Sequence, residues 1–289
     1  MTIKEIDAAL EEGQSLKAIT QAYSEIANLK IKRIRAEALR NRVFFQEILG
    51  VYALVKTLSL KKKINVPSKP KKVVSIILTS NYRFYGAINS DLLEFFVKTI
   101  QKLDTDCIYL GKAAIDYFKA QPQLNQGHVS TEVLLKDDQP DTAELLNLVG
   151  LLSNYKRVLV FYSSMKSLLV QVPTAMDITA SSSSLVNSSF VNEKRTTNNE
   201  FKFIFEPDLS KILQFFDSQI ITLLLEGTFL ESELSRTASR FISMDKAETE
   251  ANKLIKQYLT LKAYVKRNMD NNTILENFAT MMAVRKGDL

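Results

Sequence analysis

The sequence predicts an α/β fold: a central, largely parallel α/β domain flanked by two long helices that pair as an antiparallel coiled coil. All six prolines lie between residues 67 and 207, and proline is excluded from helix interiors. The C-terminal arm carries a long heptad repeat. The centre alternates apolar runs with amphipathic stretches, as βα units do. These observations divide the chain into a helix over 1–66, a domain over 67–207 and a second helix over 208–289.

The heptad repeat of the C-terminal arm is the strongest periodic signal. Its apolar seam, spaced alternately by three and four residues, comprises Met244, Ala247, Ala251, Leu254, Tyr258, Leu261 and Val265. The same phase continues through Asn268, Asn272, Leu275, Ala279 and Met282. A seam sustained over more than five heptads indicates a left-handed coiled coil of ~58 Å.

The N-terminal arm has shorter stretches of the same pattern. They comprise Ile3, Ile6 and Leu10, then Leu16, Ile19, Tyr23 and Ile26. The seam is interrupted at Gly13 and around residues 30–42. Each arm is the natural partner of the other, and the seam residues Asn268 and Asn272 would fix the register at a cost in stability.

The centre reads as a Rossmann-like α/β domain with a largely parallel sheet. The expected strands cover residues 71–81, 106–111, 156–162, 167–172 and 200–207. The expected helices cover residues 90–103, 112–121 and 141–152. Asn89 or Ser90 is expected to cap the first helix, and Asp141 with Glu144 forms a capping box for the third. The Ser/Asn-rich stretch 179–199 is expected to be a loop.

The composition excludes most catalytic chemistry. The chain has 289 residues, a net charge of +6, 46% hydrophobic residues, one Cys and one His. That is a folded protein without the ligands for a zinc site or a disulfide framework. No phosphate-binding glycine loop, secretory signal or membrane-length apolar run occurs. We therefore expect a cytoplasmic protein that is not an enzyme and has no cofactor, metal site or catalytic residues.

Four features remain as candidate functional sites. The first is a basic cluster on the N-terminal arm: Lys30, Lys32, Arg33, Arg35, Arg40 and Arg42. It fits a solvated helix face, an acidic protein partner or, without interleaved aromatics, less well a nucleic acid.

The lysines around Pro67 and Pro70 fit a solvated linker. Cys107 is expected to be a buried, inert thiol, and His128 a surface histidine. An acidic site would need Asp104, Asp106, Asp137, Asp138 and Asp141, but no glycine-rich turn accompanies them.

Several segments together resemble the gamma subunit of F-type ATP synthases. Residues 17–30 (KAITQAYSEIANLK) are similar to the family segment KIT-x-AM-x-x-VA-x-x-K. Residues 79–89 resemble its TSDRGLCGG-x-N turn, and residues 206–208 its EPD. Residues 235–244 are in register with its SE-x-ASRM-x-AM motif. The resemblance covers nearly the whole chain.

The departures from the family lie where the resemblance implies contacts with other subunits. A family glycine is Arg83, a methionine is Tyr23, and the Glu of the SE pair is Arg236. The family's Arg-Gln pair falls on Lys266-Arg267 or, shifted by one, on Arg267-Asn268. The resemblance implies these ring-contacting residues: Tyr23, Lys30, Arg33, Arg236, Lys266, Arg267 and Asn268.

The resemblance implies the rotor shaft of a rotary ATPase that couples ATP hydrolysis or synthesis to rotation. Its partners would be a hexameric ring of catalytic and non-catalytic ATPase subunits, an epsilon-like stalk subunit and a membrane rotor ring, with no nucleic acid. The complex would lie at the inner face of the cell membrane. Alternatives are a diverged F-type-like ATPase driving other machinery such as gliding, and a non-rotary coiled-coil scaffold with an α/β head. A third is a nucleotide- or nucleic-acid-binding α/β protein.

Overall fold

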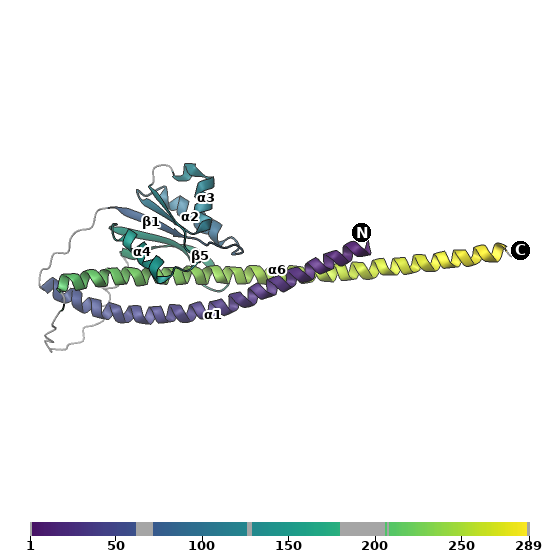
Figure 1. The fold of residues 1–289 in the computed structure, drawn as a ribbon, viewed down its shortest axis with the longest axis horizontal. Helices are drawn as coiled ribbons and strands as arrows, with labels where there is room; N and C mark the ends of the chain where they lie inside the picture. The colour runs from purple at the N-terminus through teal and green to yellow at the C-terminus, as the bar shows by residue number, and fades with distance from the viewer. Residues whose placement is uncertain (1, 62–71, 126–128, 180–205, 207, 288–289) are drawn as a thin grey trace. The chain divides into compact units, whose positions relative to one another are not determined.

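The computed structural model describes residues 2–61, 72–125, 129–179, 206 and 208–287. These residues form two compact units, each treated separately below: Leu29–Arg240, and Met1–Asn28 with Phe241–Leu289. Two helices, α1 (Ile3–Lys61) and α6 (Leu209–Gly287), contribute to both units (Figure 1). Parts of α1 and α6 share the core of the α/β domain.

The unit Leu29–Arg240 is built on a five-stranded sheet in the order β3-β2-β1-β4-β5. Its strands are β1 (Val73–Leu78), β2 (Asp106–Leu110), β3 (Ser130–Val133), β4 (Arg157–Met165) and β5 (Gln171–Asp177). β1, β2, β3 and β4 are parallel, and only β5 is antiparallel to its neighbour. The predicted, largely parallel sheet is confirmed.

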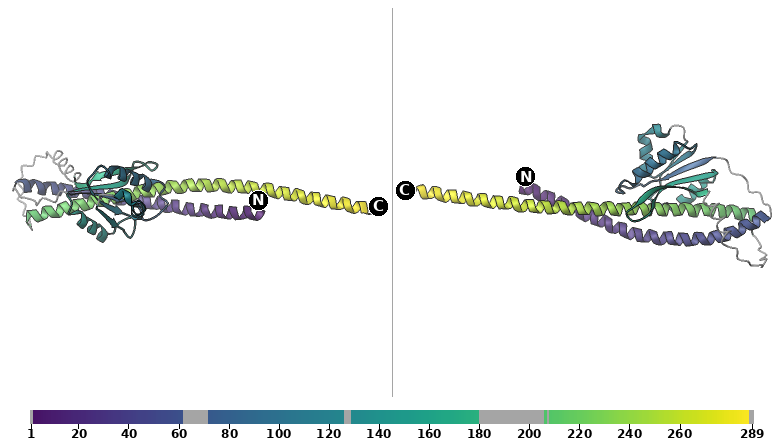
Figure 2. Two further views of the ribbon diagram at one scale, coloured as in Figure 1. Left: turned by 90° about the horizontal axis from the view of Figure 1, so that it is seen from above. Right: turned by 180° about the vertical axis from the view of Figure 1, so that it is seen from behind.

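Side chains that alternate along the strands fill two cores, one on each face of the sheet. On one face, Ile77 and Phe161 pack with α2 (Ile88–Ile100) and α3 (Lys112–Ala120). On the other, Ile76 and Val160 pack with α4 (Thr142–Leu152) and with residues of α1 and α6. Figure 2 shows the sheet lying along the green N-terminal part of α6. Parts of α1 and α6 thus form one covering layer of the domain.

Two helix starts test the capping predictions. The Asp141–Glu144 capping box is confirmed: the Asp141 carboxylate accepts from the backbone N–H groups of Ala143 and Glu144, and Glu144 accepts from that of Asp141. The predicted cap of α2 is wrong, because that helix begins two residues earlier than expected and has Ala87 at its N-cap.

The other strand predictions had mixed outcomes. The strand expected at 167–172 is displaced, since residues 167–170 form the turn before β5. The short strand β3 was not predicted from the sequence. The expected strand at 200–207, apart from Glu206, lies outside the described residues, as do His128 and nearly all of the stretch 179–199. A short 3-10 helix, η1 (Pro122–Asn125), precedes β3.

In the other unit, the ends of α1 and α6 pair as the predicted antiparallel coiled coil. Lys262 Nζ lies 2.5 Å from Asp7 Oδ1, and the Gln21 amide donates to Glu248 Oε1 at 2.7 Å. Residue numbers rise on one helix as they fall on the other, so the pair is antiparallel. Gly13 lies between these contacts, and a Cβ placed on it would come 3.1 Å from Ile255 Cγ1. The glycine therefore admits Ile255 into the seam instead of interrupting it.

The predicted seam of α1 is only partly correct. Ile6 and Leu10 are buried, but the next four predicted positions, Leu16, Ile19, Tyr23 and Ile26, are exposed. The inward stripe keeps the first phase instead and runs through Gly13, Lys17, Thr20, Ser24 and Ala27. On α6, Leu254 is 44% exposed and Ile255 faces inward in its place. Apolar residues thus exceed what the coiled coil buries.

None of the helices in the described part of the chain is both long and apolar enough to cross a lipid bilayer.

Candidate partner-binding surface

Two of the aspartates considered for an acidic site, Asp138 and Asp141, serve structural purposes. Asp138 is 3% exposed, and Asp141 caps α4. Within the described residues, no group of three His, Cys, Asp or Glu side chains is placed to hold a metal ion. Burial raises the pKa of the Cys107 thiol to about 11, which makes it a weak nucleophile.

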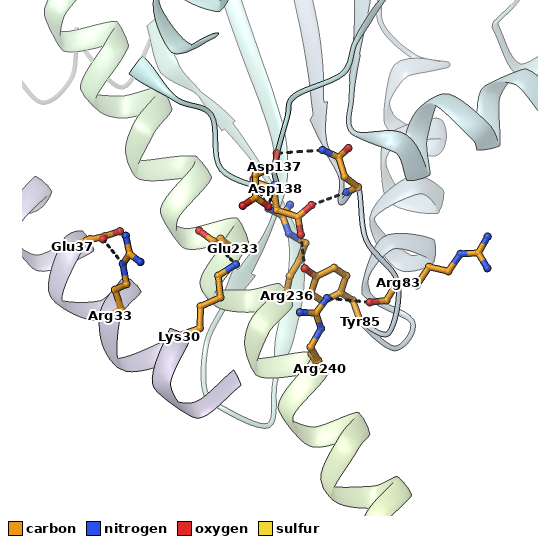
Figure 3. A network of polar contacts seen from close by, with 11 residues as sticks. Lys30, Arg33, Glu37, Arg83, Tyr85, Asp137, Asp138, Glu233, Arg236 and Arg240 are labelled. Carbon is orange, nitrogen blue, oxygen red and sulfur yellow. Dashed lines mark hydrogen bonds and ion pairs between the residues drawn. The ribbon is translucent and has the colours of Figure 1, made fainter. Parts of the chain in front are cut away.

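The loop after β1, residues 79–87, is held around the buried Asp138 (Figure 3). The Asn81 backbone N–H donates to the Asp138 carboxylate at 2.6 Å, and the Tyr85 hydroxyl donates to its other oxygen. Between them, Phe84 has φ of 68°, a left-handed conformation that is rare for an aromatic residue. The fixed neighbours on each side hold it there.

The loop's carbonyl groups are also bound by α6. Ser239 donates to the Tyr85 carbonyl at 2.6 Å, and Arg240 donates to the Arg83 carbonyl at 3.1 Å. The Arg240 guanidinium lies 4.1 Å from the centre of the Tyr85 ring, a cation–π contact. Two of the motifs that resemble the gamma family, residues 79–89 and 235–244, therefore meet in this network.

The electrostatics of the network favour a neutral Tyr85. Burial raises the pKa of Tyr85 well above its usual range, and the nearby Asp138 carboxylate raises it further. The guanidinium groups of Arg240 and Arg236 oppose that shift. A protonated hydroxyl is what the network needs, because Tyr85 is the donor to Asp138.

Arg236 was expected to contact the partner ring, but it lies in the interior of the unit. It is 2% exposed and donates to the Asp138 carbonyl at 3.1 Å and to Ser232 at 3.0 Å. Its Nε, like the Ser235 hydroxyl and one Glu233 oxygen, has no hydrogen-bond partner among the described residues. Arg236 has almost no free surface, so we leave it out of the partner surface proposed below.

The basic cluster of α1 makes two internal ion pairs. Lys30 Nζ lies 2.5 Å from Glu233 Oε1 on α6, and the Glu233 side chain is 3% exposed. Arg33 Nε lies 3.1 Å from Glu37 Oε1, and its side chain is 79% exposed. Lys30 therefore helps to join the two helices, while Arg33 stays accessible. Lys32, Arg35, Arg40 and Arg42 are exposed as well.

In the coiled-coil unit, the remaining expected contacts are on the surface. Tyr23 is 37% exposed, and Lys266, Arg267 and Asn268 are exposed on α6. Sequence reasoning missed that Tyr23 belongs to an outward apolar stripe with Leu16, Ile19 and Ile26. The signal was present as a phase shift: these residues leave the heptad set by Ile3, Ile6 and Leu10.

Comparison with known proteins gives consistent matches. The family described as ATP synthase matches residues 2–268. The ATP synthase gamma chain of Staphylococcus saprophyticus is 25% identical over 273 residues, with 88% of this chain and 89% of that protein covered. The gamma chain of Ruthia magnifica is 22% identical, with the same coverage.

Solved structures share the fold. A chain from the central stalk and c-ring of the Tetrahymena thermophila mitochondrial ATP synthase has a TM-score of 0.55 and 18% identity, covering 79% of this chain and 99% of that one. One from the rotor of the Euglena gracilis enzyme has a TM-score of 0.57 and 12% identity, covering 92% and 99%. The resemblance to gamma subunits drawn from the motifs is confirmed. Because the family match spans nearly all of the sequence, this chain belongs to the ATP synthase family.

Proposed function

We propose that this chain is the central-stalk shaft of an F-type rotary ATPase, and that catalysis belongs to a surrounding ring of ATPase subunits. The coiled-coil unit would turn inside the ring. Two unlike helices make an asymmetric shaft, which would offer each surrounding site a different surface and so bias its conformation in turn.

The observation that carries this proposal is the unpaired end of α6. Asp7, near the start of α1, already pairs with Lys262, yet α6 continues to Gly287. Every side chain from Lys266 to Met282 is exposed in the chain alone. The exposed residues include Ile274, Leu275, Phe278, Met281 and Met282, which recur at the spacing of one helix face.

An apolar face of this kind is rarely left in water. Most helical stability in proteins comes from packing of an apolar face, and exposed apolar patches mark interaction sites. The outward stripe of Leu16, Ile19, Tyr23 and Ile26 on α1 adds a second such surface. Both are explained if a ring encloses this part of the chain.

The polar ring contacts we propose are Tyr23, Lys30, Arg33, Lys266, Arg267 and Asn268. Four of the six are cationic, so the complementary ring surface would be acidic. Lys30 would contribute through its exposed portion, because its ammonium already pairs with Glu233. Arg33 is the most accessible cation of the α1 ion pairs.

The first experiment isolates the complex from native cells through a tag on this chain. P-loop ATPase subunits should co-purify, and the chain alone should release no phosphate from magnesium ATP. Turnover that follows the isolated chain through purification would refute the shaft role. Co-purification of an unrelated cargo without ATPase subunits would favour a scaffold.

The second experiment tests the unpaired end. Phe278→Asp should leave the melting of the isolated chain unchanged but lower ATP turnover of the assembled complex by about tenfold, a loss of about 1.4 kcal/mol in the coupled step. Asn277→Ala, a polar neighbour in the same helical turn, is the matched control. Parent-like turnover of Phe278→Asp would show that this face has no partner.

A further inference from the structure

A groove lies within the unit Leu29–Arg240, beside the Arg33–Glu37 ion pair shown in Figure 3. It has a volume of about 700 Å³ and is lined by residues of α1, of α4 with the segment before it, and of α6. None of the proposed ring contacts lines it. The lining residues are therefore distinct from the proposed ring contacts, although Arg33 pairs with the lining residue Glu37.

The lining of the groove mixes polar side chains with apolar ones from α1, α4 and α6. Leu223 and Phe229 of α6 are lining residues that are 5% and 2% exposed. Phe44 of α1 and Leu146 of α4 also line the groove but are 51% and 59% exposed. Exposed large apolar residues from two different helices that line one groove indicate a site for another apolar surface.

The groove also contains a carboxylate without a cation. Glu226 is half-buried, and its carboxylate accepts a hydrogen bond from the Asn41 amide at 3.0 Å. Burial raises the pKa of Glu226, the hydrogen bond from Asn41 lowers it in part, and the charge of Glu37, a lining residue that pairs with Arg33, raises it. In the described chain no Lys or Arg forms an ion pair with Glu226, although Arg40 also lines the groove. A positive charge brought by a partner would relieve this arrangement.

The walls are fixed before any partner arrives. Asn41 and Glu226 connect α1 to α6. Arg236 of α6 holds the carbonyl of Asp138, just ahead of the α4 wall, and Asp141 caps that helix. A preformed groove loses little conformational entropy on binding.

We propose that this groove binds an amphipathic helix of a partner protein, with a Lys or Arg of that helix against Glu226 and its apolar side chains between Phe44 and Leu146. Helices lie in grooves of this kind with apolar anchors at spacings of three and four residues. The charge pair would set the register, and the apolar walls would supply most of the affinity.

The test places the photo-reactive amino acid p-benzoyl-phenylalanine at position 44 or 146 in the tagged chain, expressed in native cells. The control position is Leu39, which is 64% exposed on α1 but does not line the groove. Both groove positions should crosslink to one peptide of a partner, helical and carrying Lys or Arg among apolar residues. The control should not crosslink to that peptide.

The charge is tested with Glu226→Lys, which should lower crosslinking from position 44 by about tenfold, and with Glu226→Gln, which should lower it less. If Glu226→Lys melts below the parent, Leu146→Asp at the exposed rim replaces it and should have the same effect. Unchanged crosslinking in a folded variant would overturn the proposal. So would crosslinks to a second copy of this chain, to another segment of the same chain, or to an acidic peptide.

The outcome is separable from the proposed shaft role. Glu226→Lys should still co-purify with ATPase subunits, because none of the proposed ring contacts lines the groove. Loss of those subunits together with the crosslink would show that the groove belongs to the ring interface and would refute a separate helix site.

Discussion

The α/β unit and the coiled-coil unit use apolar residues in opposite ways. In the α/β unit, large side chains such as Phe96, Phe161 and Tyr109 are almost fully buried in the core between the sheet and two of its helices. In the coiled-coil unit, Ile19, Ile26 and Phe278 are more than half exposed although their helices are regular. The first set stabilises the fold, and the second set is available to partners. Large apolar residues are thus buried in the first region and remain on the surface in the second.

The largest effect on stability should come from the α/β core. Phe96 is 0% exposed and contacts the rings of Tyr109, Phe118 and Phe161 edge-on. Phe96→Ala should lower the free energy of unfolding by about 3–5 kcal/mol, because it leaves a cavity among rigid rings. Phe278→Ala, the exposed counterpart, should change it by less than about 0.5 kcal/mol. Chemical denaturation of the isolated chain measures both, and equal losses would contradict the comparison.

The α/β unit should also lose stability at high pH, by a smaller amount. Burial is the main cause that raises the pKa of Tyr85, Tyr109 and Tyr162 far above the usual value, and carboxylates add to it at Tyr85 and Tyr162. The unfolded chain releases these protons near pH ~10, before the folded chain does. The stabilisation that these neutral tyrosines give the folded chain is therefore complete below pH ~10 and is lost as pH rises further.

Thermal melting between pH 9 and pH 11 measures this loss, which should appear as a falling melting temperature. Tyr162→Phe removes one titrating group, whose hydroxyl donates to Glu231 at 3.1 Å. The variant should start less stable but lose less between the two pH values. A slope as steep as that of the parent would show that Tyr162 does not contribute.

Within the coiled coil, an inward-facing residue should contribute more to stability than its exposed neighbour. Ile255→Ala should lower stability by about 1–2 kcal/mol, because Ile255 packs on Gly13. Leu254→Ala should cost under about 0.5 kcal/mol, because Leu254 is 44% exposed. Helix unfolding followed by circular dichroism compares the two. A larger loss for Leu254 would restore the seam predicted from the sequence.

The contrast between buried apolar residues in the α/β unit and exposed ones in the coiled-coil unit also explains which elements the sequence could predict. Alternation of strand and helix and the Asp141 capping box are local patterns, and they located β1, β2, α3 and α4. β3 has an exposed, polar pattern typical of an edge strand, so no apolar run indicated it. Periodicity reports apolar residues without distinguishing a seam inside the chain from a surface for a partner. That is why Leu16, Ile19, Tyr23 and Ile26 were assigned to the coiled-coil seam.

Arg236 illustrates a second limit. An arginine on a long helix is usually exposed, and the family resemblance implied a partner contact at this position. Its burial depends on the Asp138 carbonyl, 98 residues away in the sequence. Long-range pairing of this kind leaves no periodic signal. The motif resemblance found the right neighbourhood, residues 79–89 and 235–244, but not that its members bind one another.

The smallest effect on stability should come from Lys266 and Arg267, the expected polar contacts beside the last turn that α1 covers. Both are exposed, and exposed charges contribute only ~0–1 kcal/mol to folding. A charge-assisted hydrogen bond across an interface contributes ~1.5–3 kcal/mol. The double variant Lys266→Ala, Arg267→Ala should therefore melt like the parent. Its assembled complex should hydrolyse ATP about tenfold more slowly, since 1.4 kcal/mol corresponds to tenfold in rate.

Two controls separate this effect from a general loss of surface charge. Lys253→Ala removes an exposed cation of the same helix whose ion pair is with Glu250, three residues away, and it should leave turnover unchanged. The double variant Lys266→Gln, Arg267→Gln keeps hydrogen-bonding capacity without the charges, and it should recover part of the rate if the ring contacts are polar. If the double Ala variant assembles and turns over ATP at the parent rate, the two side chains are a solvated face, and ring contact rests on the apolar residues beyond them.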